Sequence, residues 1–215
     1  PFVLGIGGNN TASVLEKIQK TDFNGIHGIL SVVPSYNKPS QKGLYEHFKA
    51  ISEKSPVPII LYNVPGRTGK NMEPETIIQL ANDCDNIIAV KEASGNFTQA
   101  MHLIQNKPDD FTVLSGEDGI TLPLMSIGFE GVISVIGNAF PAQWSQMVNY
   151  ALNNDFQSAK KIHYQMITII EKIFAEGNPA GIKCVLSLKG IIQNYLRLPL
   201  VPVSESLENE LKQLI

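Results

Sequence analysis

The chain has 215 residues, of which 43% are hydrophobic and 17% charged, and its formal net charge is −3. This size and balance predict one globular domain with a sizeable core. Basic tracts and bilayer-length apolar runs do not occur, which argues against nucleic acid or membrane as a partner. Cys84, Cys184 and the four separated histidines lack the spacing of metal ligands, so we expect free thiols, a cytoplasmic protein and no metal.

Short apolar runs alternate with amphipathic stretches along the whole chain. The apolar runs are rich in valine and isoleucine and lack clean polar alternation, which is typical of parallel strands covered by helices. The expected strands are residues 2–6, 28–33, 57–64, 87–90, 112–114 and 132–136. The expected helices are residues 11–20, 43–55, 75–82, 96–105, 120–126, 141–152, 156–176, 179–187 and 205–214. Asn9 and Asn10 precede the first helix and Ser40 precedes the second, as N-cap residues do.

Two architectures fit this βα repeat, an open doubly wound sheet and a (β/α)8 barrel. The chain opens at Pro1 directly into a strand, which favours a TIM barrel that lacks its first two βα units. Residues 1–137 would then be a partial barrel with strands three to eight. Residues 138–215 would be the last barrel helix and a C-terminal helical extension, in one structural unit with the rest.

The apolar run 87–90 ends in Lys91, at the kind of strand end where parallel α/β folds carry their chemistry. Because strand side chains alternate, Lys91 and Glu92 point to opposite faces, and one of them faces the interior. One interpretation is an ordinary lysine that reaches water at a strand end. The alternative is a buried amine, whose pKa falls on desolvation and which attacks a carbonyl carbon.

Two further strand ends carry polar side chains. Tyr62 ends the strand 57–64 and is either a residue at the core edge or a proton shuttle. Arg67 follows on a Pro-Gly turn and is either an exposed arginine or a planar fork that grips a carboxylate.

Glycines mark two other strand-to-helix turns. Gly116 would let a ligand approach the backbone, while Glu117 and Asp118 are expected to cap the following helix. The Gly-rich turn at residues 5–8 invites a phosphate interpretation, but it is neither GxGxxG nor a P-loop, so we do not favour it.

Several segments together resemble the dihydrodipicolinate synthase family, within the dihydrodipicolinate synthase and N-acetylneuraminate lyase superfamily. The resemblance covers essentially the whole chain, and its specific pieces are GIGGN at 5–9, YNKPSQ at 36–41, YNVPGRTG at 62–69, KEASGN at 91–96 and SGED at 115–118.

The resemblance implies a TIM barrel with its substrates at the C-terminal mouth, no cofactor, and a homotetramer built as a dimer of tight dimers. Pyruvate would form an imine with the lysine that matches Lys91. The derived enamine would attack L-aspartate 4-semialdehyde, and cyclisation would give 4-hydroxy-tetrahydrodipicolinate for lysine and diaminopimelate biosynthesis.

The resemblance also implies roles for other residues of this chain. The expected proton relay is Tyr62 together with Tyr36, the latter reaching in from a neighbouring subunit. The expected substrate-binding residues are Arg67 for the semialdehyde carboxylate, Ile133 through its backbone carbonyl, and Gly116. Asn9 matches a residue of a lysine-inhibitor site.

This sequence departs from the family pattern in two places. A Gly-Thr-Thr-Gly-Glu segment, which supplies a relay threonine, does not occur in it, and Ser35 stands where lysine-inhibited members often have a second tyrosine. One alternative function is that of an N-acetylneuraminate lyase or a 2-keto-3-deoxy sugar-acid aldolase, against which Arg67 argues. A second alternative is an inactive barrel fragment or binding module, against which Lys91, Tyr62 and Arg67 argue together.

Overall fold

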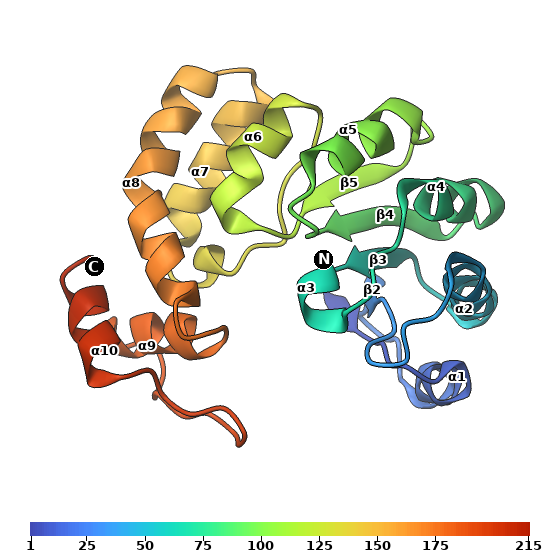
Figure 1. The fold of residues 1–215 in the computed structure, drawn as a ribbon, viewed down its shortest axis with the longest axis horizontal. Coiled ribbons are helices and arrows are strands. Elements are labelled where there is room, and N and C mark those ends of the chain that lie inside the picture. The colour runs from blue at the N-terminus through green and yellow to red at the C-terminus, as the bar shows by residue number, and fades with distance from the viewer. The chain divides into compact units, whose positions relative to one another are not determined.

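The computed structural model describes all residues, 1–215, and the chain folds into two compact units (Figure 1). The first unit comprises Pro1–Glu117 and Ile127–Ile133, and the second comprises Asp118–Ser126 and Ser134–Ile215. The division between these units falls in the connections around residues 117–134. The predicted boundary at residue 137, within one structural unit, stays a prediction. A short helix in the middle of the chain belongs with the later helices.

The first unit is built on a parallel sheet whose strand order follows the chain, β1-β2-β3-β4-β5. Sequential strands pair with one another throughout, which confirms the predicted parallel βα repeat and five of the six predicted strands. The strands are β1 (Val3–Gly5), β2 (Gly28–Val32), β3 (Ile59–Asn63), β4 (Ile87–Glu92) and β5 (Thr112–Ser115).

Four helices line one face of this sheet, and each contacts the next in the row (Figure 1). They are α1 (Thr11–Lys20), α2 (Gln41–Lys54), α4 (Pro74–Asp83) and α5 (Phe97–Asn106). Asn10 and Ser40 cap α1 and α2, because their side-chain oxygens accept backbone N–H groups of the first turn. The short helix α3 (Pro65–Thr68) occupies the segment that we predicted as a Pro-Gly turn.

Burial alternates along β3 and β5 and distinguishes the two faces of the sheet, whereas Ala89–Glu92 of β4 are buried throughout. Leu61, Val90 and Val113 face the helix row and are wholly buried. Leu30 and Ile60, of the opposite parity, are only half-buried. The helix-covered face therefore carries the core of the unit, and the other face is available for a site.

The sixth predicted strand, residues 132–136, is wrong. Only Val132 makes a ladder contact, an isolated bridge to Ser115, and a 3-10 turn follows at Ile136–Asn138. The Asp118 carboxylate accepts the backbone N–H groups of Val135 and Ile136 at 2.9 and 2.8 Å. Because a side chain takes these donors, they are not available to a strand ladder.

The second unit is helical. It contains α6 (Thr121–Ser126), α7 (Pro141–Leu152), α8 (Phe156–Phe174), α9 (Ala180–Leu188) and α10 (Glu205–Lys212), with a 3-10 turn at Asp118–Ile120 before α6. α7 and α8 pack along each other, and α9 and α10 pack against α8 (Figure 1). All the helices predicted here are confirmed, and their ends lie within about two residues of the expected positions. None of the helices combines the length and apolar character that crossing a membrane requires.

Candidate functional site

Lys91 lies near the end of β4, with its neighbour Glu92 on the opposite face of the sheet. Lys91 is 9% exposed and Glu92 is 3% exposed, so both charged side chains are buried. Lys91 shares the parity of the half-buried face, and Glu92 shares that of the helix-covered face. The lysine is therefore not the solvated strand-end residue of our first interpretation.

Tyr62 lies beside Lys91 on the same face. The two residues are direct partners in the register of β3 with β4. The Lys91 Nζ lies 4.2 Å from the centroid of the Tyr62 ring. An aromatic face at this distance attracts the ammonium form and also shields the amine from water on one side.

The pKa of Tyr62 reflects three influences. Burial raises it above the ordinary value of 10.0, the positive charge of Arg67 opposes that rise, and the negative charge of Glu117 adds to it. Tyr62 is therefore a neutral phenol at physiological pH, with two opposite charges close enough to tune its acidity.

Gly116 is required by the packing of the lysine. A Cβ at this position would stand 2.7 Å from the Ala93 Cβ and 2.9 Å from the Lys91 Cε, closer than carbon atoms approach one another. The Gly116 N–H also donates to the Glu92 carbonyl at 2.8 Å. The glycine thus leaves room for the Lys91 side chain, in addition to any role toward a ligand.

Arg67 lies on α3 and lines a cavity of about 440 Å³ in the first unit. Tyr62 lines the same cavity, and so do glycines of the Gly-rich turn after β1. At Gly7 a Cβ would lie 2.9 Å from the Val32 Cγ1, so close packing alone requires this glycine.

Tyr36 lies on a loop that is anchored beside α3. Its side chain is 89% exposed, and its backbone is left-handed with φ of 72°. Its N–H donates to the Thr68 carbonyl at 3.3 Å. A bulky residue with positive φ is unusual, which indicates that the loop holds the Tyr36 side chain outward against a backbone preference.

Asn9 supports the same loop from the turn before α1. Its Nδ2 donates to the Ser35 carbonyl at 3.3 Å, and its carbonyl accepts from the Asn37 Nδ2 at 2.8 Å. Both residues that flank Tyr36 therefore bind Asn9.

Ile133 ends the short segment that extends the sheet beyond β5. Its N–H donates to the Ser115 carbonyl at 2.9 Å, and the Ser115 N–H donates to the Gly131 carbonyl at 2.9 Å. Ile133 is half-buried and lies next to the strand end that leads into Gly116.

The expected cap at Glu117 and Asp118 is wrong for Asp118, which is the buried member of the pair. As described above, its carboxylate binds the start of the turn at Ile136–Asn138 instead of capping the helix that follows it. The N–H groups of Val135 and Ile136, which lie at the start of a turn, are the free donors that the fold brings to the Asp118 carboxylate. They are distant from Asp118 in the sequence.

A buried polar network behind the lysine was missed by the sequence analysis. The Glu92 Oε2 accepts from the Asn63 Nδ2 at 2.8 Å and from the Gln99 Nε2 at 3.3 Å, and the Glu92 Oε1 accepts from the Ser94 N–H at 2.6 Å. Asn71 joins the amides of Asn63 and Gln99. The available signal was the polar residue that follows each candidate side chain, Asn63 after Tyr62 and Glu92 after Lys91.

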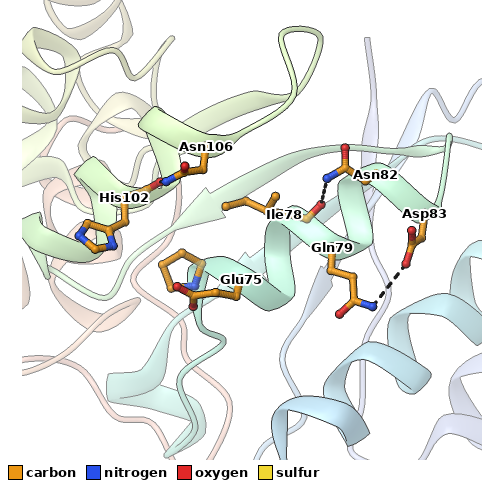
Figure 2. A pocket seen from close by; sticks show the side chains of 8 residues that line it. Glu75, Ile78, Gln79, Asn82, Asp83, His102 and Asn106 are labelled. Atoms are coloured by element: carbon orange, nitrogen blue, oxygen red, sulfur yellow. Dashed lines mark hydrogen bonds between the residues drawn. The ribbon is translucent and has the colours of Figure 1, made fainter.

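Another cavity, of about 580 Å³, lies on the outer side of α4 and α5, away from this chemistry (Figure 2). Asn82 and Asn106 bind carbonyls of their own helices there, and Gln79 binds Asp83. These bonds are local to each helix, so the cavity presents no converging groups. The structure has no cluster of three or more potential metal ligands, and Cys84 and Cys184 are free and buried.

Comparisons with known proteins identify the family to which the chain belongs. Residues 1–215 match the Dihydrodipicolinate synthetase family. The 4-hydroxy-tetrahydrodipicolinate synthase of Parabacteroides distasonis is 56% identical over 218 residues, which include all of this chain and 73% of that protein. The chain belongs to the dihydrodipicolinate synthetase family.

Solved structures of the family have the same fold as this chain. The dihydrodipicolinate synthase of Thermotoga maritima is 38% identical, with a TM-score of 0.97 over 100% of this chain and 74% of that one. The chloride-inhibited dihydrodipicolinate synthase of Acinetobacter baumannii, complexed with pyruvate, is 36% identical, with a TM-score of 0.95 over 100% of this chain and 73% of that one. The predicted family is therefore confirmed.

The first prediction concerns the space at Gly116. Gly116→Ala should lower kcat on the order of 10-fold or more and destabilise the protein by about 1–3 kcal/mol, because the new methyl group displaces the Lys91 side chain. Turnover and urea denaturation measure the two effects. Gly66→Ala is the control, since a Cβ there meets nothing within 4 Å. Equal behaviour of the two variants would contradict the packing argument.

The second prediction concerns the acidity of Tyr62. Removing the positive charge in Arg67→Ala should raise the Tyr62 pKa further, and removing the negative charge in Glu117→Gln should lower it. NMR titration of ¹³C-labelled tyrosine measures both shifts, and Tyr62→Phe assigns the signal. Shifts of the same sign in the two charge variants would disprove the electrostatic account.

Proposed function

We propose that this protein condenses pyruvate with L-aspartate 4-semialdehyde to give 4-hydroxy-tetrahydrodipicolinate, a step of lysine and diaminopimelate biosynthesis. The observation that carries the proposal is the buried Lys91 amine against the Tyr62 ring at a strand end. Membership of the family and the name of its Parabacteroides relative support it. The chemistry requires a nucleophilic amine and proton transfer, and it requires no cofactor.

Lys91 would act as the covalent catalyst. Its neutral Nζ attacks the ketone carbon of pyruvate, and loss of water gives an imine. Loss of a proton from the pyruvate methyl group gives an enamine, whose carbon attacks the aldehyde of the second substrate. The amino group of that substrate then attacks the imine carbon, closes the ring and displaces Lys91.

Tyr62 would carry protons between these steps. Burial keeps its phenol neutral, so it can donate a proton to the departing hydroxyl and recover one later. We assign Tyr36 to the same relay in a neighbouring subunit. Its outward, 89% exposed side chain on a strained backbone supports a role away from its own subunit.

Arg67 would bind the carboxylate of aspartate semialdehyde. A guanidinium presents two parallel N–H donors to a carboxylate, and Arg67 lines the cavity that Tyr62 also lines. We assign Ile133 to the substrate pocket through its backbone carbonyl, Gly116 to the same pocket, and Asn9 to an effector site beside the Tyr36 loop.

We further propose that the five parallel strands belong to a closed (β/α)8 barrel. Sequential pairing, an added bridge at Val132 and helices along one face support it. The numbering of these strands within a barrel, a C-terminal helical extension, a homotetramer and a cytoplasmic location remain predictions.

The third prediction tests the imine. Incubating the purified protein with pyruvate and borohydride should add a pyruvate-derived mass to the peptide that contains Lys91, because reduction traps the covalent intermediate. Peptide mass spectrometry locates the adduct, and Lys91→Arg should give none. An adduct on another lysine, or no adduct, would refute the proposed role of Lys91.

The fourth prediction tests the second substrate. Arg67→Ala should lose about 2–4 kcal/mol of kcat/KM for aspartate semialdehyde, the scale of a truncated charged pair, while imine formation with pyruvate persists. The exposed Arg197 provides the control variant, Arg197→Ala. If the wild-type protein cleaves N-acetylneuraminate or a keto-deoxy sugar acid faster than it consumes aspartate semialdehyde, it belongs functionally with those lyases.

A further inference from the structure

The residues directly after Tyr62 and Lys91 form a second pair on the other face of the sheet. Asn63 and Glu92 are partners in the same register, one step beyond the Tyr62 and Lys91 pair. Their side chains are joined by the 2.8 Å bond from the Asn63 Nδ2 to the Glu92 Oε2. A hydrogen bond therefore ties the two strands together directly behind the candidate catalytic pair.

Each member of this pair is itself held in place. The Glu92 Oε1 accepts the Ser94 N–H at 2.6 Å, and the Asn63 Oδ1 accepts the Met72 N–H at 3.0 Å. Gln99 adds a second amide donor to the Glu92 Oε2. Both side chains thus have fixed orientations, because each is bonded to the backbone as well as to its partner.

The strand pair needs such a constraint at this end. Its register shifts near the start, where Ile59 pairs with Ile87 but Ile60 pairs with Ala89, so that Ile88 is passed over. Side chains change faces with every residue, so a slip of one position would take Lys91 from the Tyr62 face to the helix-covered face. The hydrogen bond between the Asn63 and Glu92 side chains, at the C-terminal end of the strand pair, selects the register in which Tyr62 lies opposite Lys91.

Burying the Glu92 carboxylate in this pair costs free energy of desolvation. A carboxylate that is 3% exposed loses its hydration, and here uncharged amides and a backbone N–H supply its hydrogen bonds. The main effect of a buried network whose hydrogen bonds are all satisfied is to select one geometry, and its contribution to stability is smaller.

We propose that Asn63 and Glu92 are positioning residues, a clamp behind the sheet that holds Lys91 against Tyr62 for imine formation. This inference rests on the proposed function. Neither residue contacts the face that carries the amine, so the clamp acts through the backbone of β3 and β4 alone.

Single substitutions break the clamp with little change in side-chain volume. In Glu92→Gln, the new amide N–H group faces an N–H donor of Asn63 or Ser94, so one hydrogen bond is lost. In Asn63→Asp, the new carboxylate faces the Glu92 carboxylate and repels it. Each should slow imine formation, measured in a single turnover with borohydride trapping, by about 10- to 100-fold, the scale of a small misplacement of a reacting group.

The double variant Asn63→Asp/Glu92→Gln should restore the rate to within about three-fold of wild type. The amide introduced at position 92 would donate to the carboxylate introduced at position 63, and the amides of Asn71 and Gln99 can flip to reverse their bonds with these two residues. Only the two long bonds to the Met72 carbonyl, both of 3.4 Å, are lost. The strands are again joined, with the charge moved from β4 to β3.

Asn71→Ala is the matched control. Asn71 bonds to Asn63 and Gln99 but not to Glu92, so its loss weakens the network and leaves the clamp. We expect lower stability in urea denaturation with an imine rate within about three-fold of wild type. An imine rate in this control as slow as in Glu92→Gln would mean a merely structural role and overturn the clamp.

The remaining outcomes separate the clamp from the function on which it rests. A wild-type protein that forms no imine at Lys91 overturns the proposed function and the clamp together. A wild-type imine that forms equally fast in folded Glu92→Gln overturns the clamp alone. If both single variants fail to fold, Gln99→Leu removes one donor to Glu92 and should slow the imine about 10-fold, well outside the margin set for the control. A rate within about three-fold of wild type there also overturns the clamp.

Discussion

The pairing of β3 with β4 in one register is the constraint on which the candidate site depends. It sets Tyr62 opposite Lys91 on one face and Asn63 opposite Glu92 on the other. The alternation of strand side chains then allows two consecutive ionisable residues to have different environments. The amine lies against an aromatic ring, and the carboxylate lies among amide donors beneath the helices.

This separation matters for the chemistry because a lysine nucleophile must be neutral. A carboxylate on the same face, close to the amine, would favour the ammonium form and suppress the nucleophile. The aromatic ring of Tyr62 carries no formal charge and shields the amine from water on one side, while its face attracts the ammonium form. The formal charges that influence Tyr62 come from Arg67 and Glu117. The sheet therefore separates the Glu92 carboxylate from the face that carries Lys91 and Tyr62.

The segments that follow the strands contribute space for the lysine side chain, the arginine of the site and the anchor of the Tyr36 loop. Gly116 has no side chain, so the lysine methylenes fit against the backbone of the turn that follows β5. The short helix α3 carries Arg67 beside Tyr62 and also anchors the Tyr36 loop through the Thr68 carbonyl. Substrate-binding and subunit-contact proposals thus converge on one short segment that follows β3.

Much of this was determined by the sequence alone. Runs of valine and isoleucine separated by amphipathic stretches predicted the parallel sheet and its helices, because the spacing of apolar residues along each segment indicates which of its faces are buried. The motifs around Tyr62, Lys91 and Gly116 indicated the family through their resemblance to its sequence pattern. The tertiary structure alone decided the rest. The end of the sheet at Val132, the true partner of Asp118 and the network around Glu92 depend on hydrogen bonds between residues far apart in the chain, and no local pattern encodes those.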